Sequence, residues 1–218
     1  MDSEPEPKRA VTRAAADVRA WFGGVPVTLG AIAVLGCWHA LASPLAAALG
    51  TERFGTWFVA RGSPSPGWLL ATLSHADLNH LLANLLLLAI WGTITESTLG
   101  ARRYAAFLAV TGVAGILSQV ALYVVRGVSG GIVGASGAAQ AATAFAVVTL
   151  ALGRGPLETA AIRYGALAGA VSIVSLQLLN DFVGALTVVP ESSGIAHLAG
   201  IVLGATYAVV DSRQEKSG

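Results

Sequence analysis

Charged side chains are scarce in this sequence. They make up 11% of the 218 residues, whereas a soluble domain carries about 25%. Because a globule of this size needs a polar shell, so few charges exclude an ordinary water-soluble protein and a disordered chain. The net charge is only +1, so the chain also lacks the basic surface with which a protein binds the phosphates of nucleic acid.

Cysteine is almost absent as well. The single Cys37 excludes an intramolecular disulfide framework, and we expect it to be a small apolar side chain in a helix. The HExxH pattern of helical zinc sites does not occur in the sequence. We therefore expect neither a metal nor another cofactor.

Apolar residues fill the space that charges leave. Hydrophobic residues reach 55% and the mean hydropathy is +0.69. The charges interrupt the chain and leave six stretches free of Asp, Glu, Lys and Arg, at residues 20–51, 78–95, 104–125, 127–153, 164–180 and 192–210. Each is close to or above the roughly 17–25 residues that cross a bilayer as a helix. The stretches show no strict alternation, so helices are favoured over the strands of a barrel.

The pattern predicts an all-α membrane protein with six transmembrane helices. We expect them at roughly residues 26–48, 79–99, 104–125, 136–153, 159–179 and 195–211. We divide the chain into a polar cytoplasmic tail over 1–22, a membrane domain over 23–212 and a short cytoplasmic tail over 213–218. The first 20 residues are polar and interrupted by proline, so we expect no cleaved signal peptide, and residues 10–22 could form a short interfacial helix.

The distribution of Lys and Arg predicts the orientation. With a cytoplasmic N-terminus, ten of these residues lie on the inner side and three lie on the outer side, namely Arg53, Arg61 and Arg126. This bias predicts that both termini are cytoplasmic. The N-terminal ends of the second, fourth and sixth helices then meet near the outer face.

The outer end of the second helix carries polar residues within an apolar sequence. His80 and Asn84 are four residues apart, which places them on one face of the helix. Polar groups inside a span are candidates for function, although hydrogen bonding between helices is an alternative. His75 and His80 could suggest a metal site, but i,i+5 spacing would place them about 140° apart on a helix, unlike helical zinc ligands.

The outer end of the fourth helix is rich in small residues. Ser136 stands where a loop with Gly134 becomes a helix. The first N–H groups of a helix have no partner within it, so an oxyanion beside Ser136 would find donors in place. The alternative is that Ser136 is only an N-cap and the glycines only form a turn.

The outer end of the sixth helix carries His197. Gly200 and Gly204 form a GxxxG pattern on the same side of the helix, which lets a neighbouring helix approach closely. If that neighbour is the helix that begins at Ser136, His197 can reach the serine hydroxyl. A nucleophile and a base within hydrogen-bonding reach are the minimum for acyl transfer by serine.

Together these segments resemble the rhomboid intramembrane serine proteases. The resemblance covers roughly residues 65–211. It rests on the following motifs: His75, His80 and Asn84 in the order H-x4-H-x3-N; Glu96 and Gly100; Gly134-Ala135-Ser136-Gly137 as GxSG; His197, Gly200 and Gly204 as AHxxGxxxG; and Asp211.

The resemblance implies a six-helix rhomboid-like bundle and roles for its residues. Ser136 would be the nucleophile and His197 the general base of a Ser-His dyad. The oxyanion would be stabilised by His80, Asn84 and the backbone N–H of Ser136. Supporting roles are implied for two further residues: Gly134 would shape the loop, and His75 would organise the first loop and nearby water. Glu96 would tie the second helix to neighbouring backbone.

The sequence also departs from the family pattern. Gln140 stands where many members have an aromatic residue that stacks on the catalytic imidazole, so either Gln140 or another group must orient His197. We expect residues 180–193 to form a flexible cap over the site. Asp77 and Asp181 are candidates for a third catalytic member, but we expect solvation at a loop or helix end for both.

The expected function is hydrolysis of a peptide bond in or near transmembrane segments of membrane-protein substrates, in a prokaryotic plasma membrane. Two alternatives stay open. One is a non-catalytic rhomboid-like protein that binds or escorts membrane proteins, although such relatives lack the serine or the histidine. The other is a small transporter or channel, which would often show internal symmetry and paired broken helices.

Overall fold

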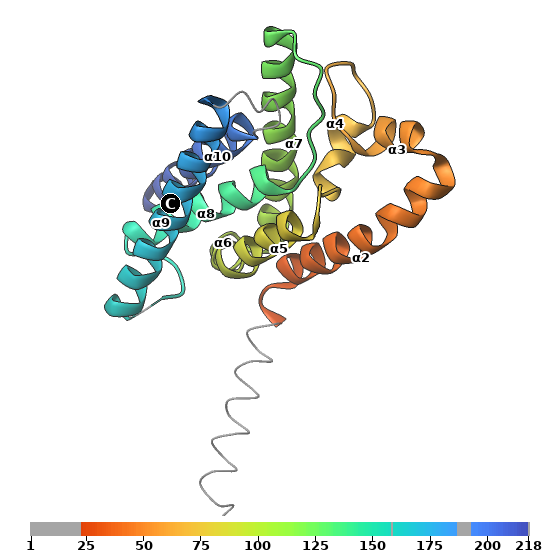
Figure 1. The fold of residues 1–218 in the computed structure, drawn as a ribbon. Coiled ribbons are helices and arrows are strands. Elements are labelled where there is room, and N and C mark those ends of the chain that lie inside the picture. Colours follow the sequence, from red (N-terminus) through yellow and green to blue (C-terminus); the bar gives the residue numbers. More distant parts are fainter. Residues whose placement is uncertain (1–22, 158, 187–192, 218) are drawn as a thin grey trace, which may run out of the picture.

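The computed structural model describes residues 23–157, 159–186 and 193–217, and within these ranges the chain is helical apart from its connecting loops (Figure 1). The expected interfacial helix over residues 10–22 lies outside the described residues. The elements in chain order are α2 (Pro26–Leu49), α3 (Thr51–Phe58), α4 (Gly67–Leu70), η1 (Ala71–Leu73), α5 (Leu78–Leu87), η2 (Leu88–Gly92), α6 (Thr93–Leu99), α7 (Ala101–Arg126), α8 (Ser136–Ala151), α9 (Ala160–Leu186) and α10 (Gly194–Ser217).

Five helical segments are long and apolar enough to cross a membrane. They are α2, the continuous run from Leu78 to Leu99, α7, α9 and α10. The fourth predicted span, at residues 136–153, corresponds to α8, which has 16 residues and a length of about 24 Å. This is shorter than the roughly 30 Å hydrocarbon core. The architecture is an all-helical membrane-type bundle with five helical segments long enough to span, and the predicted number of six full-length spans is not confirmed.

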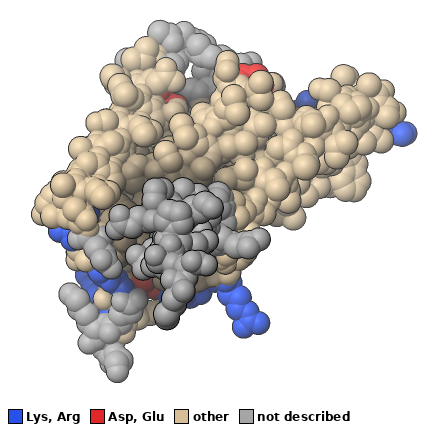
Figure 2. All heavy atoms as spheres, turned by 90° about the horizontal axis from the view of Figure 1, so that it is seen from below, with Lys and Arg blue, Asp and Glu red and all other residues tan. Residues whose placement is uncertain are grey.

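The outer surface of the bundle suits lipid. Large apolar side chains are exposed on several helices, including Val110 and Val125 of α7 and Leu176 of α9. On the face shown in Figure 2, uncharged residues cover most of the described surface, and Lys and Arg atoms lie toward its margins. A soluble protein rarely exposes apolar patches of this extent, so these surfaces fit contact with acyl chains.

The centre of the bundle is α8. Thirteen of its 16 residues are buried, most of them alanine and other small residues. It packs most extensively against α10 and then against α7. Short side chains let the helix backbones approach one another, and this compensates for the weak hydrophobic drive between helices in lipid.

The second span contains a change of helix type. α5 and α6 are joined by the π-helical turn η2. The Leu88 N–H is shared between the carbonyls of Asn84 and Leu85. The Thr93 hydroxyl donates to Ala89 O at 3.0 Å and to Ile90 O at 2.8 Å. These bonds serve carbonyls that the wider turn would otherwise leave without partners in an apolar environment.

The loops at one end of the bundle are joined by backbone hydrogen bonds. Ala60 and Ile132 form an isolated antiparallel bridge, with N–H to O distances of 3.0 and 2.9 Å. The Gly134 N–H also donates to Ala71 O at 2.9 Å. These bonds connect the segment before α8 to the loops around α4, and they fix the backbone immediately before Ser136.

Candidate functional site

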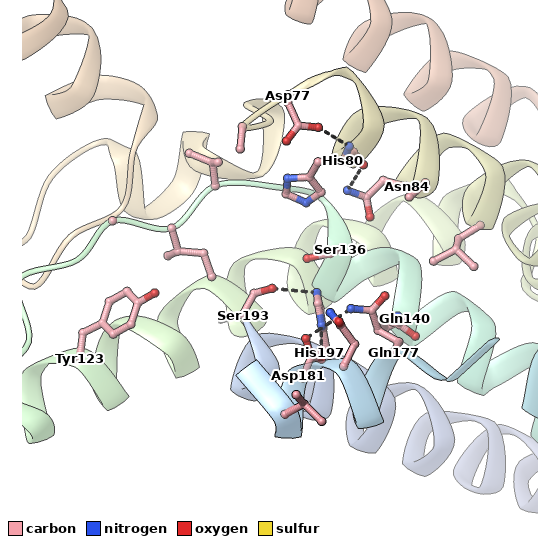
Figure 3. Close-up of a pocket in the computed structure, with 18 residues that line it drawn as sticks. Asp77, His80, Asn84, Tyr123, Ser136, Gln140, Gln177, Asp181, Ser193 and His197 are labelled. Atoms are coloured by element: carbon pink, nitrogen blue, oxygen red, sulfur yellow. Dashed lines mark hydrogen bonds and ion pairs between the residues drawn. The ribbon is translucent and has the colours of Figure 1, made fainter. Parts of the chain in front are cut away.

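The N-terminal ends of α5, α8 and α10 meet around one cavity, as the sequence predicts. Its volume is about 680 Å³, and its lining includes His80 of α5, Ser136 of α8 and His197 of α10. α9 completes the lining with Asp181 and neighbouring residues. Figure 3 shows these side chains pointing toward a common space from the four helices.

Ser136 is the first residue of α8, and its side chain is largely buried. Gly134, two residues earlier, has a φ of +125°, which glycine adopts readily and other residues rarely do. A Cβ at Gly134 would lie 2.8 Å from Nε2 of His80 and 3.8 Å from Oγ of Ser136. The glycine therefore gives the loop its conformation and leaves room for the His80 ring beside the serine.

α10 lies close to α8 because two glycines of α10 face the backbone of α8. A Cβ on Gly200 would collide with the carbonyl oxygen of Gly137, and one on Gly204 would collide with that of Ala141. Gly137 follows Ser136 directly, and Gly200 lies one turn after His197. The predicted close partnership between the helix of Ser136 and the helix of His197 is therefore present.

The His197 imidazole is held at both ring nitrogens. Nδ1 lies 2.7 Å from Oδ2 of Asp181, and Nε2 lies 3.2 Å from Oγ of Ser193. The side chains of His197 and Asp181 are 6% and 9% exposed. Because a carboxylate only accepts hydrogen bonds, this arrangement places a proton on Nδ1, and in the neutral imidazole Nε2 is then the acceptor.

The expected solvation of Asp181 is wrong. Its carboxylate is buried and contacts the imidazole, and its other oxygen accepts from Nε2 of Gln177 at 3.3 Å. A buried carboxylate in an apolar helix needs such partners because it has given up its hydration. Asp77, by contrast, is the N-cap of α5, and its Oδ1 accepts from the His80 N–H at 2.8 Å.

The expected cap over residues 180–193 also needs correction. α9 continues to Leu186, so the first part of this segment, including Asp181, is helical. Residues 187–192 lie outside the described residues. Ser193 stands immediately before α10 and accepts the His197 N–H through its carbonyl at 3.1 Å.

His80 and Asn84 both face the cavity from α5. Asn84 is buried, and its Nδ2 donates to the carbonyl of His80 at 3.1 Å. The shared helix face inferred from their spacing is thus present. Together with Ser136 across the cavity, they supply an imidazole, an amide and a helix N-terminus around one space (Figure 3).

His75 is not on the helix of His80, so the angle of about 140° predicted from helical spacing is wrong. α5 begins at Leu78. The rings of His75 and His80 pack edge to face, with a distance of 5.0 Å between the ring centroids. Nε2 of His75 accepts a long hydrogen bond of 3.5 Å from the Ala135 N–H. Burial and then repulsion from His80 lower the pKa of His75 to about 4, so the ring is neutral at pH 7.

Gln140 lines the cavity one turn after Ser136 and is buried. Its Oε1 has no hydrogen-bond partner among the described residues. At the His197 imidazole, the contact to Nδ1 comes from Asp181.

Sequence reasoning missed Ser193, and it named Asp181 only to expect its solvation. A local signal was present for Ser193, because it stands four residues before His197, about one helical turn away.

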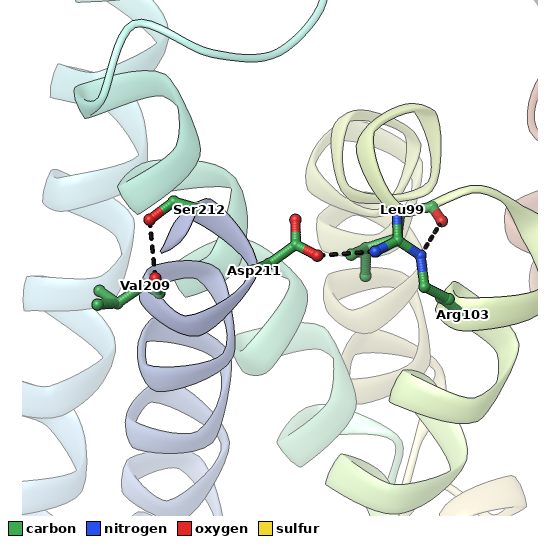
Figure 4. Close-up of polar contacts among 5 residues, drawn as sticks. All are labelled: Leu99, Arg103, Val209, Asp211 and Ser212. Carbon is green, nitrogen blue, oxygen red and sulfur yellow. Dashed lines mark hydrogen bonds and ion pairs between the residues drawn. The ribbon is translucent and has the colours of Figure 1, made fainter. Parts of the chain in front are cut away.

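Two acidic residues of the motif lie away from the cavity. The buried Glu96 accepts from the Val27 and Thr28 N–H groups at 2.8 and 2.7 Å, so it caps α2 and has the expected structural role. Asp211 of α10 pairs with Arg103 of α7 at 2.7 Å, and Arg103 also donates to Leu99 O (Figure 4).

Comparison with known families adds an independent observation. The model of the Rhomboid domain matches residues 66–214, which is most of the chain. The chain belongs to the rhomboid family. The resemblance inferred from the sequence motifs is therefore confirmed, and the rhomboid match includes both Ser136 and His197. A comparison with curated proteins found no match.

Proposed function

We propose that this rhomboid is an intramembrane serine endopeptidase with Ser136 as nucleophile and His197 as general base. The observation that carries the proposal is the common cavity of Ser136 and a buried, hydrogen-bonded His197. The substrates would be membrane proteins with a transmembrane segment that unwinds and presents a peptide carbonyl at the cavity. No metal or other cofactor enters this chemistry.

The proposed oxyanion site comprises His80, Asn84 and the backbone N–H of Ser136. The N-terminus of α8 supports this assignment, because its first N–H groups have no partner within the helix. His80 and Asn84 border the same cavity from α5. The positive φ of Gly134 supports its role in shaping the loop, and Gly200 would keep α10 close to α8.

The reaction would proceed by acyl transfer. His197 Nε2 takes the proton of the Ser136 hydroxyl while Oγ bonds to the peptide carbon, and the carbonyl electrons move to oxygen. The tetrahedral intermediate collapses, the C–N bond breaks, and His197 returns the proton to the leaving amine. A water molecule, deprotonated by His197, then hydrolyses the acyl-enzyme.

Two serines border the cavity, and we assign the nucleophile to Ser136. Ser193 is the serine whose hydroxyl contacts Nε2 of His197 in this structure. Ser136, however, stands at the helix end that faces His80 and Asn84, where donors for an oxyanion converge. Ser193 stands immediately before α10, the helix that carries the base.

The proposed setting is a plasma membrane with cytoplasmic N- and C-termini. The excess of Lys and Arg on the inner loops supports this orientation, and the five long apolar helices support a multi-pass protein. In this orientation the cavity lies toward the outer face.

A non-catalytic rhomboid that escorts membrane proteins is the second candidate. It would need neither serine nor histidine, whereas this chain has both at one cavity. The two functions differ in one measurable property, since only the protease forms a covalent adduct with a serine-reactive probe.

The test uses the full chain in liposomes with a labelled single-span substrate. Ser136→Ala and His197→Ala should each lower cleavage by about 10⁴-fold or more, and fluorophosphonate labelling should require both residues. Ser193→Ala is the matched control, because it removes a hydroxyl from the same cavity and should keep labelling. Cleavage retained in Ser136→Ala would falsify the assignment, and labelling lost only in Ser193→Ala would transfer the nucleophile to Ser193.

A further inference from the structure

Asp181 extends the candidate dyad toward α9. Its carboxylate lies 2.7 Å from Nδ1 of His197, and both side chains are nearly excluded from solvent. A carboxylate on a membrane-spanning helix is costly unless it is paired, and such residues generally mark functional sites.

The sequence of α9 points this carboxylate inward. Gln177, Asn180 and Asp181 follow a helical spacing and line the cavity, whereas Leu176 and Leu179 are exposed on the outside of the bundle. Gln177 holds the second oxygen of Asp181. The Asp181 carboxylate is therefore held by a residue of its own helix as well as by the imidazole on α10.

We infer that Asp181 is the positioning residue of a Ser136–His197–Asp181 triad. This inference rests on the proposed protease function and adds a third member to its dyad. Asp181 acts through His197 and touches no reacting atom. It orients the ring and fixes the proton on Nδ1, so that the lone pair of Nε2 faces the cavity.

The proton balance explains the benefit to the reaction. When Ser136 Oγ bonds to the substrate carbon, its proton moves to Nε2 and the imidazole becomes a cation, while Nδ1 keeps its proton and its hydrogen bond to Asp181. The carboxylate stabilises this cation beside the newly formed oxyanion. When the C–N bond breaks, the proton on Nε2 moves to the leaving nitrogen, and Asp181 stays ionised throughout.

Nuclear magnetic resonance tests the inference without any substrate. The chain has four histidines, so histidine labelled with ¹⁵N gives few signals, and a His197→Gln sample identifies that of His197. We expect the Nδ1–H tautomer for His197 in the parent and its loss in Asp181→Asn, since an amide can donate to Nδ1 where the carboxylate cannot. An Nε2–H tautomer in the parent overturns the inference.

Kinetics in liposomes give the second readout. Asp181→Asn should lower kcat by about 10³–10⁴-fold with KM unchanged, and Asp181→Glu should keep more activity because it restores a carboxylate. Glu52→Gln, at an exposed position of α3, is the control. It removes a carboxylate that does not line the cavity and should keep the parent kcat.

The outcomes separate the two proposals. A parent-like kcat in Asp181→Asn overturns the triad, and so does a raised KM with kcat unchanged. If the parent shows no hydrolysis that depends on Ser136, the protease proposal fails. The His197 tautomer in the parent and in Asp181→Asn then decides by itself whether Asp181 positions the ring.

Discussion

The hydroxyl of Ser193 lies 3.2 Å from Nε2 of His197. In a neutral imidazole that donates from Nδ1 to Asp181, Nε2 is the acceptor and the Ser193 hydroxyl is the donor. The lone pair that our proposed mechanism requires for Ser136 is thus engaged by another serine in this conformation. Activation of Ser136 would replace this hydrogen bond with its own.

Removal of the competing hydroxyl should help the reaction. We expect Ser193→Ala to raise kcat/KM by a few-fold, up to about tenfold, because the hydrogen bond that must be replaced is worth about 0.5–1.5 kcal/mol. Cleavage of a labelled single-span substrate measures the change, and Ser193→Thr, which keeps a hydroxyl, is the control. A lower kcat/KM in Ser193→Ala with normal labelling of Ser136 would contradict the idea of competition.

The GxxxG pattern of α10 (Gly200 and Gly204) and that of α9 (Gly165 and Gly169) should respond differently to added methyl groups. Gly200→Ala places a Cβ against the Gly137 carbonyl, whereas a Cβ at Gly169 in α9 meets no atom within 4 Å. Gly200→Ala should lower stability by about 1–3 kcal/mol, and the displacement of His197 should lower kcat/KM by about 10²-fold. Thermal unfolding in detergent and substrate cleavage measure both effects.

Gly169→Ala is the matched control for that substitution. It has the same size and also lies within a helix, and it should leave cleavage unchanged. If both variants lose activity equally, the close packing of α8 and α10 is not the cause.

Glu96 should contribute to stability rather than to chemistry. Its carboxylate accepts from Val27 and Thr28 at the start of α2 while it is 1% exposed. Glu96→Gln should destabilise the fold by about 1.5–3 kcal/mol, as expected for hydrogen bonds to a charged group. Glu52→Gln, at an exposed position of α3, should change stability by no more than about 0.5 kcal/mol. Equal unfolding midpoints for the two variants would refute the capping role.

The neutral state of His75 should make stability depend on pH. Its pKa is lowered from 6.5 to about 4 in the folded chain, so the unfolded chain takes up this proton at a higher pH than the folded chain does. As far as His75 is concerned, the free energy of unfolding is therefore highest above about pH 6.5 and decreases as the pH falls toward 4. Unfolding midpoints measured across this range should decrease more in the parent than in His75→Gln, whose amide does not titrate. Parallel curves would show that His75 is not responsible.

The sequence predicts the helices and much of the site because both leave local patterns. Charge-free stretches of sufficient length indicate the long helices, and the spacing of His80 and Asn84 places them on one face. Gly200 and Gly204 indicate a close helix neighbour, and the glycine-rich sequence before Ser136 indicates a turn into α8. Each of these inferences depends on residues that lie in one continuous stretch of the sequence.

Other features depend on contacts that local spacing does not contain. Asp181 meets His197 across two helices, and a position near the end of an apolar stretch looks the same whether a carboxylate is solvated or buried. His75 and His80 meet because the chain between them is not helical. α8 is short and buried at the centre of the bundle, and the long charge-free stretch around it does not show where the helix begins and ends.

The π-helical turn η2 sets the rotation of one half of the second span relative to the other. Its wider turn holds one residue more than an α-helical turn would, so His80 faces the cavity while Glu96 faces α2. Conversion of η2 to an α-helical turn with no residue removed would rotate the two halves by about 100° relative to each other. A change of helix type in this one turn, with every side chain of the site retained, would thus detach the imidazole of His80 from the rest of the site.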